Sequence, residues 1–153
     1  MELMKINLLV GLGILFSSAL ISSCGEKNNP SETESKKIQA AVTVGDWKIT
    51  KLEDSGNDET SHFSGYLFQF TDLGIINATK NGSTVSGTWS ITSDDSGDDS
   101  AYDLDFNIFF SLTNEFEELN DDWEILTHSS TKIELIDVSG GNGGTDYLTF
   151  EKN

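Results

Sequence analysis

The stretch GDWKIT at residues 45–50 is the main indication of the fold, because all three Trp of the chain occur in similar short sequences. GTWSIT follows at residues 87–92 and DDWEILT at residues 121–127, and each Trp stands two residues before an Ile. Residues two apart on a β-strand share one face, so each phrase predicts a strand start whose Trp and Ile point inward. The unequal spacing of the phrases excludes a solenoid repeat, whose period is fixed.

The same alternation of apolar and polar residues continues from Val42 to the end of the chain, divided by clusters of Gly, Asn, Asp and Ser. Asn81-Gly82 is the strongest hairpin signal, because a type I′ turn requires positive φ at both central residues. Every connection is short enough for a hairpin, which favours an all-β fold, an eight-stranded antiparallel up-and-down barrel. The predicted strands are Asp46–Glu53, Phe63–Thr71, Gly74–Thr79, Thr84–Thr92, Ala101–Phe110, Trp123–Ser129, Lys132–Asp137 and Tyr147–Lys152.

Strand direction fixes the expected places of the three Trp. In an up-and-down barrel the fourth and sixth strands begin at the end opposite to the first. We therefore expect Trp89 and Trp123 to close one end and Trp47 the other. The segment TNEFEELN at residues 113–120 is either a loop or a helical turn capped by Asn114, with Glu117 at the third helical position.

The inward positions of the predicted strands carry many aromatic side chains. In one strand Leu104, Phe106 and Ile108 share a face, while Asp105 and Asn107 share the other. Eight-stranded barrels are either filled by side chains or wide enough to hold one small ligand, and the sequence leaves both possibilities open. The residues that would line a cavity for a small apolar ligand are Trp47, Tyr66, Phe68, Trp89, Tyr102, Phe106 and Trp123.

The first 23 residues read as a signal peptide, with Lys5 before an apolar run that is too short to span a bilayer comfortably. The run ends in ISSC, which resembles the lipobox of bacterial lipoproteins and implies cleavage before Cys24 and acylation of that residue. More than one acyl chain anchors a protein stably. Gly25 implies, by the same resemblance, the outer membrane of a Gram-negative cell. The alternatives are an ordinary signal peptide or a poor membrane helix.

Residues 24–43 are predicted to be the acylated Cys and a flexible linker, because the segment has almost no bulky apolar residues to bury. The barrel domain is then expected at residues 44–153. Its surface is strongly acidic: the net charge of the chain is −17, with nine Lys and no Arg. A nucleic-acid partner requires a basic surface and is excluded, whereas a basic protein would be attracted.

No cofactor, metal ion or catalytic activity is expected from the remaining polar residues. The loop at residues 92–103 offers Asp94, Ser96, Asp98 and Asp103 as possible calcium ligands, but a solvated hairpin tip is the favoured interpretation. His62 and His128 are predicted to be surface residues. Asp103 and Asp105 point outward, and exposed carboxylates make poor general acids.

GDWKIT at the start of an eight-stranded pattern resembles the G-x-W motif of the lipocalins. With SGTWSI in mid-domain, LNDDWEILTHSSTKIELID near the end and YLTFEK at the close, the chain resembles the small lipocalin-like lipoproteins of Gram-negative bacteria. The resemblance implies a calycin-like barrel with Gly45 and Trp47 in the structural motif. The chain departs from the animal lipocalins in having no Arg to stack on the first Trp and no room for a C-terminal helix.

These observations together predict a lipid-anchored outer-membrane protein, facing either the periplasm or the cell exterior. Its barrel is expected to be a binding module for a small apolar ligand or a partner. The alternative is an acidic interaction or inhibitor module that has a filled barrel and captures a basic protein.

Overall fold

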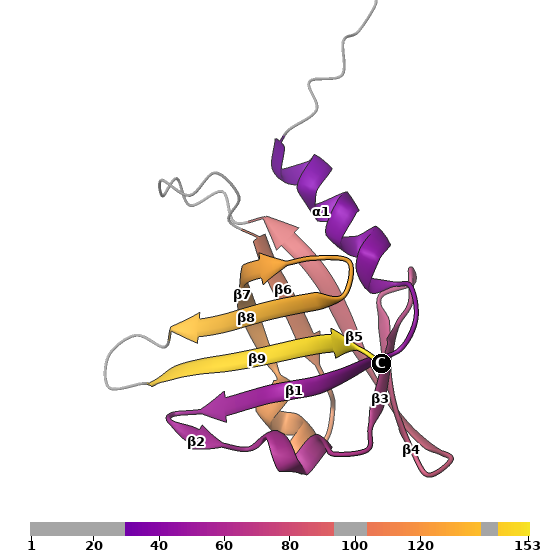
Figure 1. Ribbon diagram of the computed structural model, residues 1–153, viewed down its shortest axis with the longest axis vertical. Coiled ribbons are helices and arrows are strands. Elements are labelled where there is room, and N and C mark those ends of the chain that lie inside the picture. The colour runs from indigo at the N-terminus through magenta and orange to yellow at the C-terminus, as the bar shows by residue number, and fades with distance from the viewer. Residues whose placement is uncertain (1–29, 94–103, 139–143) are drawn as a thin grey trace, which may run out of the picture.

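A computed structural model describes residues 30–93, 104–138 and 144–153 and shows a closed antiparallel barrel (Figure 1). The sheet order is β1-β3-β4-β5-β6-β7-β8-β9, and pairing of β1 with β9 closes it. The eight-stranded up-and-down barrel predicted from the sequence is therefore confirmed. The barrel strands are β1 (Trp47–Asp54), β3 (Leu67–Phe70), β4 (Ile75–Lys80), β5 (Ser83–Ser93), β6 (Leu104–Phe109), β7 (Asp121–His128), β8 (Lys132–Val138) and β9 (Thr145–Lys152).

Between β1 and β3 the chain adds two short elements that the sequence pattern did not predict. The two-residue strand β2 (Asn57–Asp58) pairs with the end of β1, and the 3₁₀ helix η1 (Thr60–Phe63) follows it. The predicted strand Phe63–Thr71 is thus wrong at its beginning. Gly65 has φ +84°, a left-handed conformation that interrupts an extended chain, so regular pairing begins only at Leu67.

Two glycines occupy positions that require Gly, one in a turn and one at a close contact between strands. Asn81 and Gly82 have φ of 52° and 81°, as the predicted two-residue hairpin between β4 and β5 requires. Gly87, in the second Trp phrase, lies against β6: an added Cβ would be 2.5 Å from the carbonyl oxygen of Phe109. A side chain at that position would separate the two strands.

The barrel interior is a continuous core of apolar side chains. Leu104, Phe106 and Ile108 are buried, as the alternation in β6 predicted. Aromatic rings meet across the interior from different strands: the Phe70 centroid lies 5.5 Å from that of Phe106 and 5.4 Å from that of Phe150. These separations are those of favourable edge-to-face pairs. Side chains therefore fill the described part of the interior between β3, β6 and β9.

One end of the barrel is covered by a helix, α1 (Pro30–Val42), which crosses the end at which β1 begins (Figure 1). The prediction of a flexible linker is wrong for these residues. Ile38 and Val42, one helical turn apart, are almost completely buried against the barrel. On the outer side of the helix Lys36 pairs with Glu32, and Pro30 occupies a helix start, where its missing N–H costs nothing.

The opposite end is covered by η1 and by a second 3₁₀ helix, η2 (Glu115–Leu119). The side-chain oxygen of Asn114 accepts a hydrogen bond from the Phe116 amide at 3.3 Å, which confirms the capped helical turn and resolves the open alternative. Phe116 is fully buried, and its ring meets that of Phe63 in η1 edge to face at 5.4 Å. The two short helices are therefore held together by core packing.

The three Trp are buried as predicted, and Trp47 and Trp123 lie at opposite ends as predicted, but Trp89 does not lie at its predicted end. The Trp47 indole donates to the Val42 carbonyl and the Trp89 indole to the Thr71 carbonyl, both at the α1 end. The Trp123 indole donates to Leu119 at the η2 end. The prediction that Trp89 shares an end with Trp123 is wrong because β5 begins at Ser83, so that Trp89 lies well inside the strand rather than at its start.

Candidate functional site

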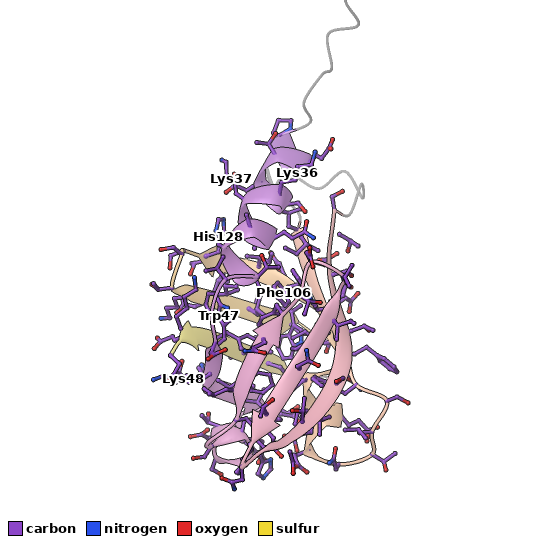
Figure 2. All side chains as sticks on the ribbon, turned by 90° about the vertical axis from the view of Figure 1, so that its right-hand side faces the viewer. Lys36, Lys37, Trp47, Lys48, Phe106 and His128 are labelled. Atoms are coloured by element: carbon purple, nitrogen blue, oxygen red, sulfur yellow. The ribbon has the colours of Figure 1, made fainter. Side chains whose placement is uncertain are left out.

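The residues predicted to line a ligand cavity lie mostly in the closed core. Trp47, Phe68 and Phe106 are inaccessible to solvent, and Trp89 and Trp123 are nearly so. Figure 2 shows Trp47 and Phe106 among the side chains of the barrel. Tyr66 is half-buried and packs at the edge of the core. This degree of burial fits a packing role for these side chains.

The N–H groups of the three indoles also make hydrogen bonds within the fold. Each indole N–H donates to a backbone carbonyl, at 2.8 Å for Trp47, 3.0 Å for Trp89 and 3.1 Å for Trp123. Over the Trp47 ring lies the Lys152 ammonium, 5.1 Å from the ring centroid. The chain has no Arg, and Lys152 supplies the cation over this ring. The sequence analysis missed it because Lys152 reaches Trp47 only through β1–β9 pairing.

An open hollow of about 610 Å³ lies on the outside of the barrel over β5 and β6. Phe109 lines it and exposes 57% of its surface, an unusual state for a Phe. Thr88 lies between Phe109 and Ile75 in the strand register. Thr88 and Phe109 line both this hollow and a smaller one of about 310 Å³, which Ile75 also borders. The residues around the larger hollow are Thr88, Trp89, Ser90, Asn107, Ile108, Phe109, Asn120 and Asp121.

This outer hollow was not among the predicted sites, although the alternation in β6 does contain a signal for it. Phe106 and Ile108 point inward, so Phe109 falls on the outward face. An aromatic residue at an outward position is the signal that a strand pattern gives for a surface contact. The hollow itself depends on the turn after β6, where Asn120 binds both backbone groups of Phe110.

Asp121 gives the rim of the hollow a carboxylate with unusual properties. Partial burial raises the pKa of Asp121 to about 6, helped by a hydrogen bond involving Asp122 and by the negative charge of Asp137. Asp121 pairs with the inward-facing Ile108 in the strand register, and Asp121 and Phe109 both line the hollow. An exposed aromatic ring and an acidic group therefore border the same hollow on the barrel surface.

A further hollow of about 460 Å³ adjoins η1 and includes Tyr66 in its lining. The Lys80 ammonium lies 4.9 Å from the centre of the Tyr66 ring. Of the predicted ligand residues that the structure describes, Tyr66 and Trp89 border these hollows, each a different one.

Both histidines lie on the surface, as predicted, and each contacts a carboxylate. His128 Nε2 lies 3.2 Å from the Glu34 carboxylate, which links β7 to α1 (Figure 2). His62 lies between two carboxylates, those of Glu59 and Glu118. The hydrogen bond between the His62 ring and the Glu118 carboxylate, at 3.1 Å, raises the pKa of His62, and the negative charge of Glu118 adds to this effect.

Several predicted residues lie outside the described part of the chain. These are Cys24, the predicted lipidation site, Tyr102, and the acidic-loop residues Asp94, Ser96, Asp98 and Asp103. Asp105 is described and lies on the outward side of β6, opposite Glu124. Among the residues described, none of the helices combines the length and the apolar character that crossing a bilayer requires.

Comparisons with known proteins find similarity among solved structures. No family model matches the chain, and no curated protein matches it. Among solved structures, the chain is similar to a DUF4847 family protein from Bacteroides vulgatus, with 19% sequence identity and a TM-score of 0.48. The similarity covers 76% of this chain and 97% of that protein.

Proposed function

We propose that this protein is a lipid-anchored protein of the Gram-negative outer membrane whose filled barrel captures a basic protein partner at its outer face. The observation that carries the proposal is the outer hollow, which is bordered by the exposed ring of Phe109 and by Asp121. A Lys or Arg side chain of a partner can place its cationic group over the ring and near the carboxylate. The net charge of −17 would speed the encounter with such a partner.

The packing of the interior supports this function over transport of a small apolar ligand inside the barrel. The rings of Phe70, Phe106 and Phe150 meet where such a ligand would sit. A ligand could enter only by displacing side chains from a close-packed core, in which even small volume changes are costly.

The anchoring part of the proposal rests on Cys24 and on the resemblance of the sequence before it to a lipobox. Residues 25–29 separate this Cys from the start of α1, and a chain of that length spans at most about 20 Å. The α1 end of the barrel would then lie close to the bilayer. Replacing Cys24 with Ala should abolish labelling by radioactive palmitate; a variant that keeps both the label and its membrane association would contradict the anchor.

The partner-binding part is tested with the anchored protein in its own cells by chemical crosslinking and mass spectrometry. We expect a basic protein crosslinked to the wild type, with the yield strongly reduced in Phe109→Ala and Asp121→Asn. Leu126→Ala is the matched control, because Leu126 is 54% exposed on β7 and does not border the hollow. Yields that are equal in all four proteins would reject the outer hollow as the site.

A second candidate function is binding of a small apolar ligand in the same outer hollow. Its volume of about 610 Å³ lies in the range of small-molecule sites, and Trp89, Ile108 and Phe109 supply apolar lining. Native mass spectrometry of the protein purified from its own cells separates the two candidates. A retained small molecule that is lost in Phe109→Ala supports the second; a bare wild-type barrel supports the first.

A further inference from the structure

His62 lies in a group of three potential metal ligands that come from two separate elements. Glu59 immediately precedes η1, His62 is within η1, and Glu118 is within η2. The Nδ1 atom of His62 lies 3.1 Å from the Glu118 carboxylate, and Nε2 lies 3.3 Å from the Glu59 carboxylate. One donor atom from each side chain lies within 4.8 Å of the donor atoms of the other two.

The backbone beneath these side chains is held in place by the core. Phe63 follows His62 directly and is buried, and Phe116, two residues before Glu118, is fully buried. Their rings pack edge to face at 5.4 Å, which fixes η1 against η2. Asn114 caps η2, and the Thr60 amide bonds the Asp58 carboxylate at the start of η1. The three donors are therefore presented from rigid supports, as a metal site requires.

The chemistry of the donors selects the kind of ion. One imidazole nitrogen with two carboxylate oxygens suits zinc and similar divalent transition metals, whereas calcium and magnesium favour sets made only of oxygen. In a tetrahedral zinc site with bonds of about 2.0 Å, neighbouring ligand atoms lie about 3.3 Å apart. The distance between His62 Nε2 and the Glu59 oxygen already has this value. Glu118 would reach the ion by rotation of its own partly exposed side chain.

We infer that Glu59, His62 and Glu118 form a zinc-type metal site that joins η1 to η2 at the end of the barrel opposite α1. Three protein ligands leave one tetrahedral position for water or for a donor from a binding partner. Glu115, also in η2, adds negative charge near His62 and favours a cation there. This inference is independent of the proposed capture of a basic protein, because the outer hollow shares none of these residues.

The test is zinc titration of the purified full chain by isothermal calorimetry and thermal unfolding. Both are done in a Cys24→Ala background, because a free thiolate is itself a zinc ligand. We expect one zinc ion per chain bound at this site and a higher melting temperature in zinc, by mass action. Magnesium at equal ionic strength should produce no such shift. His62→Ala should weaken zinc binding by about tenfold or more, and Glu59→Gln and Glu118→Gln should each weaken it as well.

His128→Ala is the matched control, because His128 also lies on the surface beside a single carboxylate. It should bind zinc as tightly as the parent protein. A second readout is the imidazole resonances of His62 in the folded parent protein, which should shift on addition of zinc. Zinc affinity that is equal in the parent and His62→Ala proteins, or His62 resonances that do not respond, would overturn the inference and leave a histidine held only by hydrogen bonds to its carboxylates.

Discussion

At the scale of single residues, Asp121 gives the protein a pH dependence of known sign. The pKa of this carboxyl is raised to about 6 in the folded state, above its ordinary value of 3.8. The folded state therefore holds the proton more tightly than the unfolded chain does. Stability from this group is present at acidic pH and is lost as the pH rises from about 4 through about 6.

We expect Asp121→Asn to remove this contribution. The wild type should lose about 1 kcal/mol more free energy of unfolding between pH 4.5 and pH 7.5 than the variant does, a modest value because water screens a partly exposed group. Urea unfolding of both proteins at the two pH values measures the difference. A pH dependence that is the same in both would mean that burial of this carboxyl has no energetic effect.

Two residues also show what the alternation of apolar and polar residues can predict by itself. It places Phe106 inside, which is correct, and the same pattern extended to Phe109 puts that residue outside, where it is exposed. It cannot show that Asp121 borders the same hollow as Phe109, because that placement comes from the register of β6 with β7. Nor can it bring together His62 and Glu118, which are 56 residues apart and meet only across the end of the closed barrel. The sequence therefore predicts which face each residue occupies, but not which residues become neighbours.

At the scale of elements, α1 is the part of the fold that the sequence analysis missed. Its sequence, PSETESKKIQAAV, is polar enough to suggest a linker, and only Ile38 and Val42 are deeply buried. The strands were predictable because alternation repeats over many residues and Asn-Gly fixes a turn. A short helix that buries only two side chains gives no comparable signal in the sequence. Its stability comes from packing on the barrel rather than from its own composition.

Truncation of Ile38 tests whether α1 belongs to the folded unit. Ile38 is 2% exposed, so Ile38→Ala should reduce the free energy of unfolding by about 2–4 kcal/mol, as expected for loss of a buried aliphatic side chain. Lys36→Ala, which removes an exposed pair with Glu32, should change it by less than about 0.5 kcal/mol. Equal and small effects in the two variants would show that the barrel is stable without the helix.

At the scale of the whole molecule, we propose different roles for the two ends and the outer wall of the barrel. The α1 end leads back toward Cys24 and the proposed membrane anchor, and the opposite end carries the His62 group. The proposed partner site lies on the wall between them, over β5 and β6. If the partner binds at the outer wall, the aromatic side chains of the interior serve to stabilise the fold and do not bind the partner.

The central claim is this division between a packed interior and a binding surface, and thermal unfolding of two variants tests it most directly. Trp123 is 2% exposed, so Trp123→Ala should cost about 3–5 kcal/mol and lower the melting temperature by many degrees. Phe109 is 57% exposed, so Phe109→Ala should leave the melting temperature almost unchanged. A Trp123→Ala protein that melts with the wild type, or a Phe109→Ala protein that melts far below it, would contradict the account.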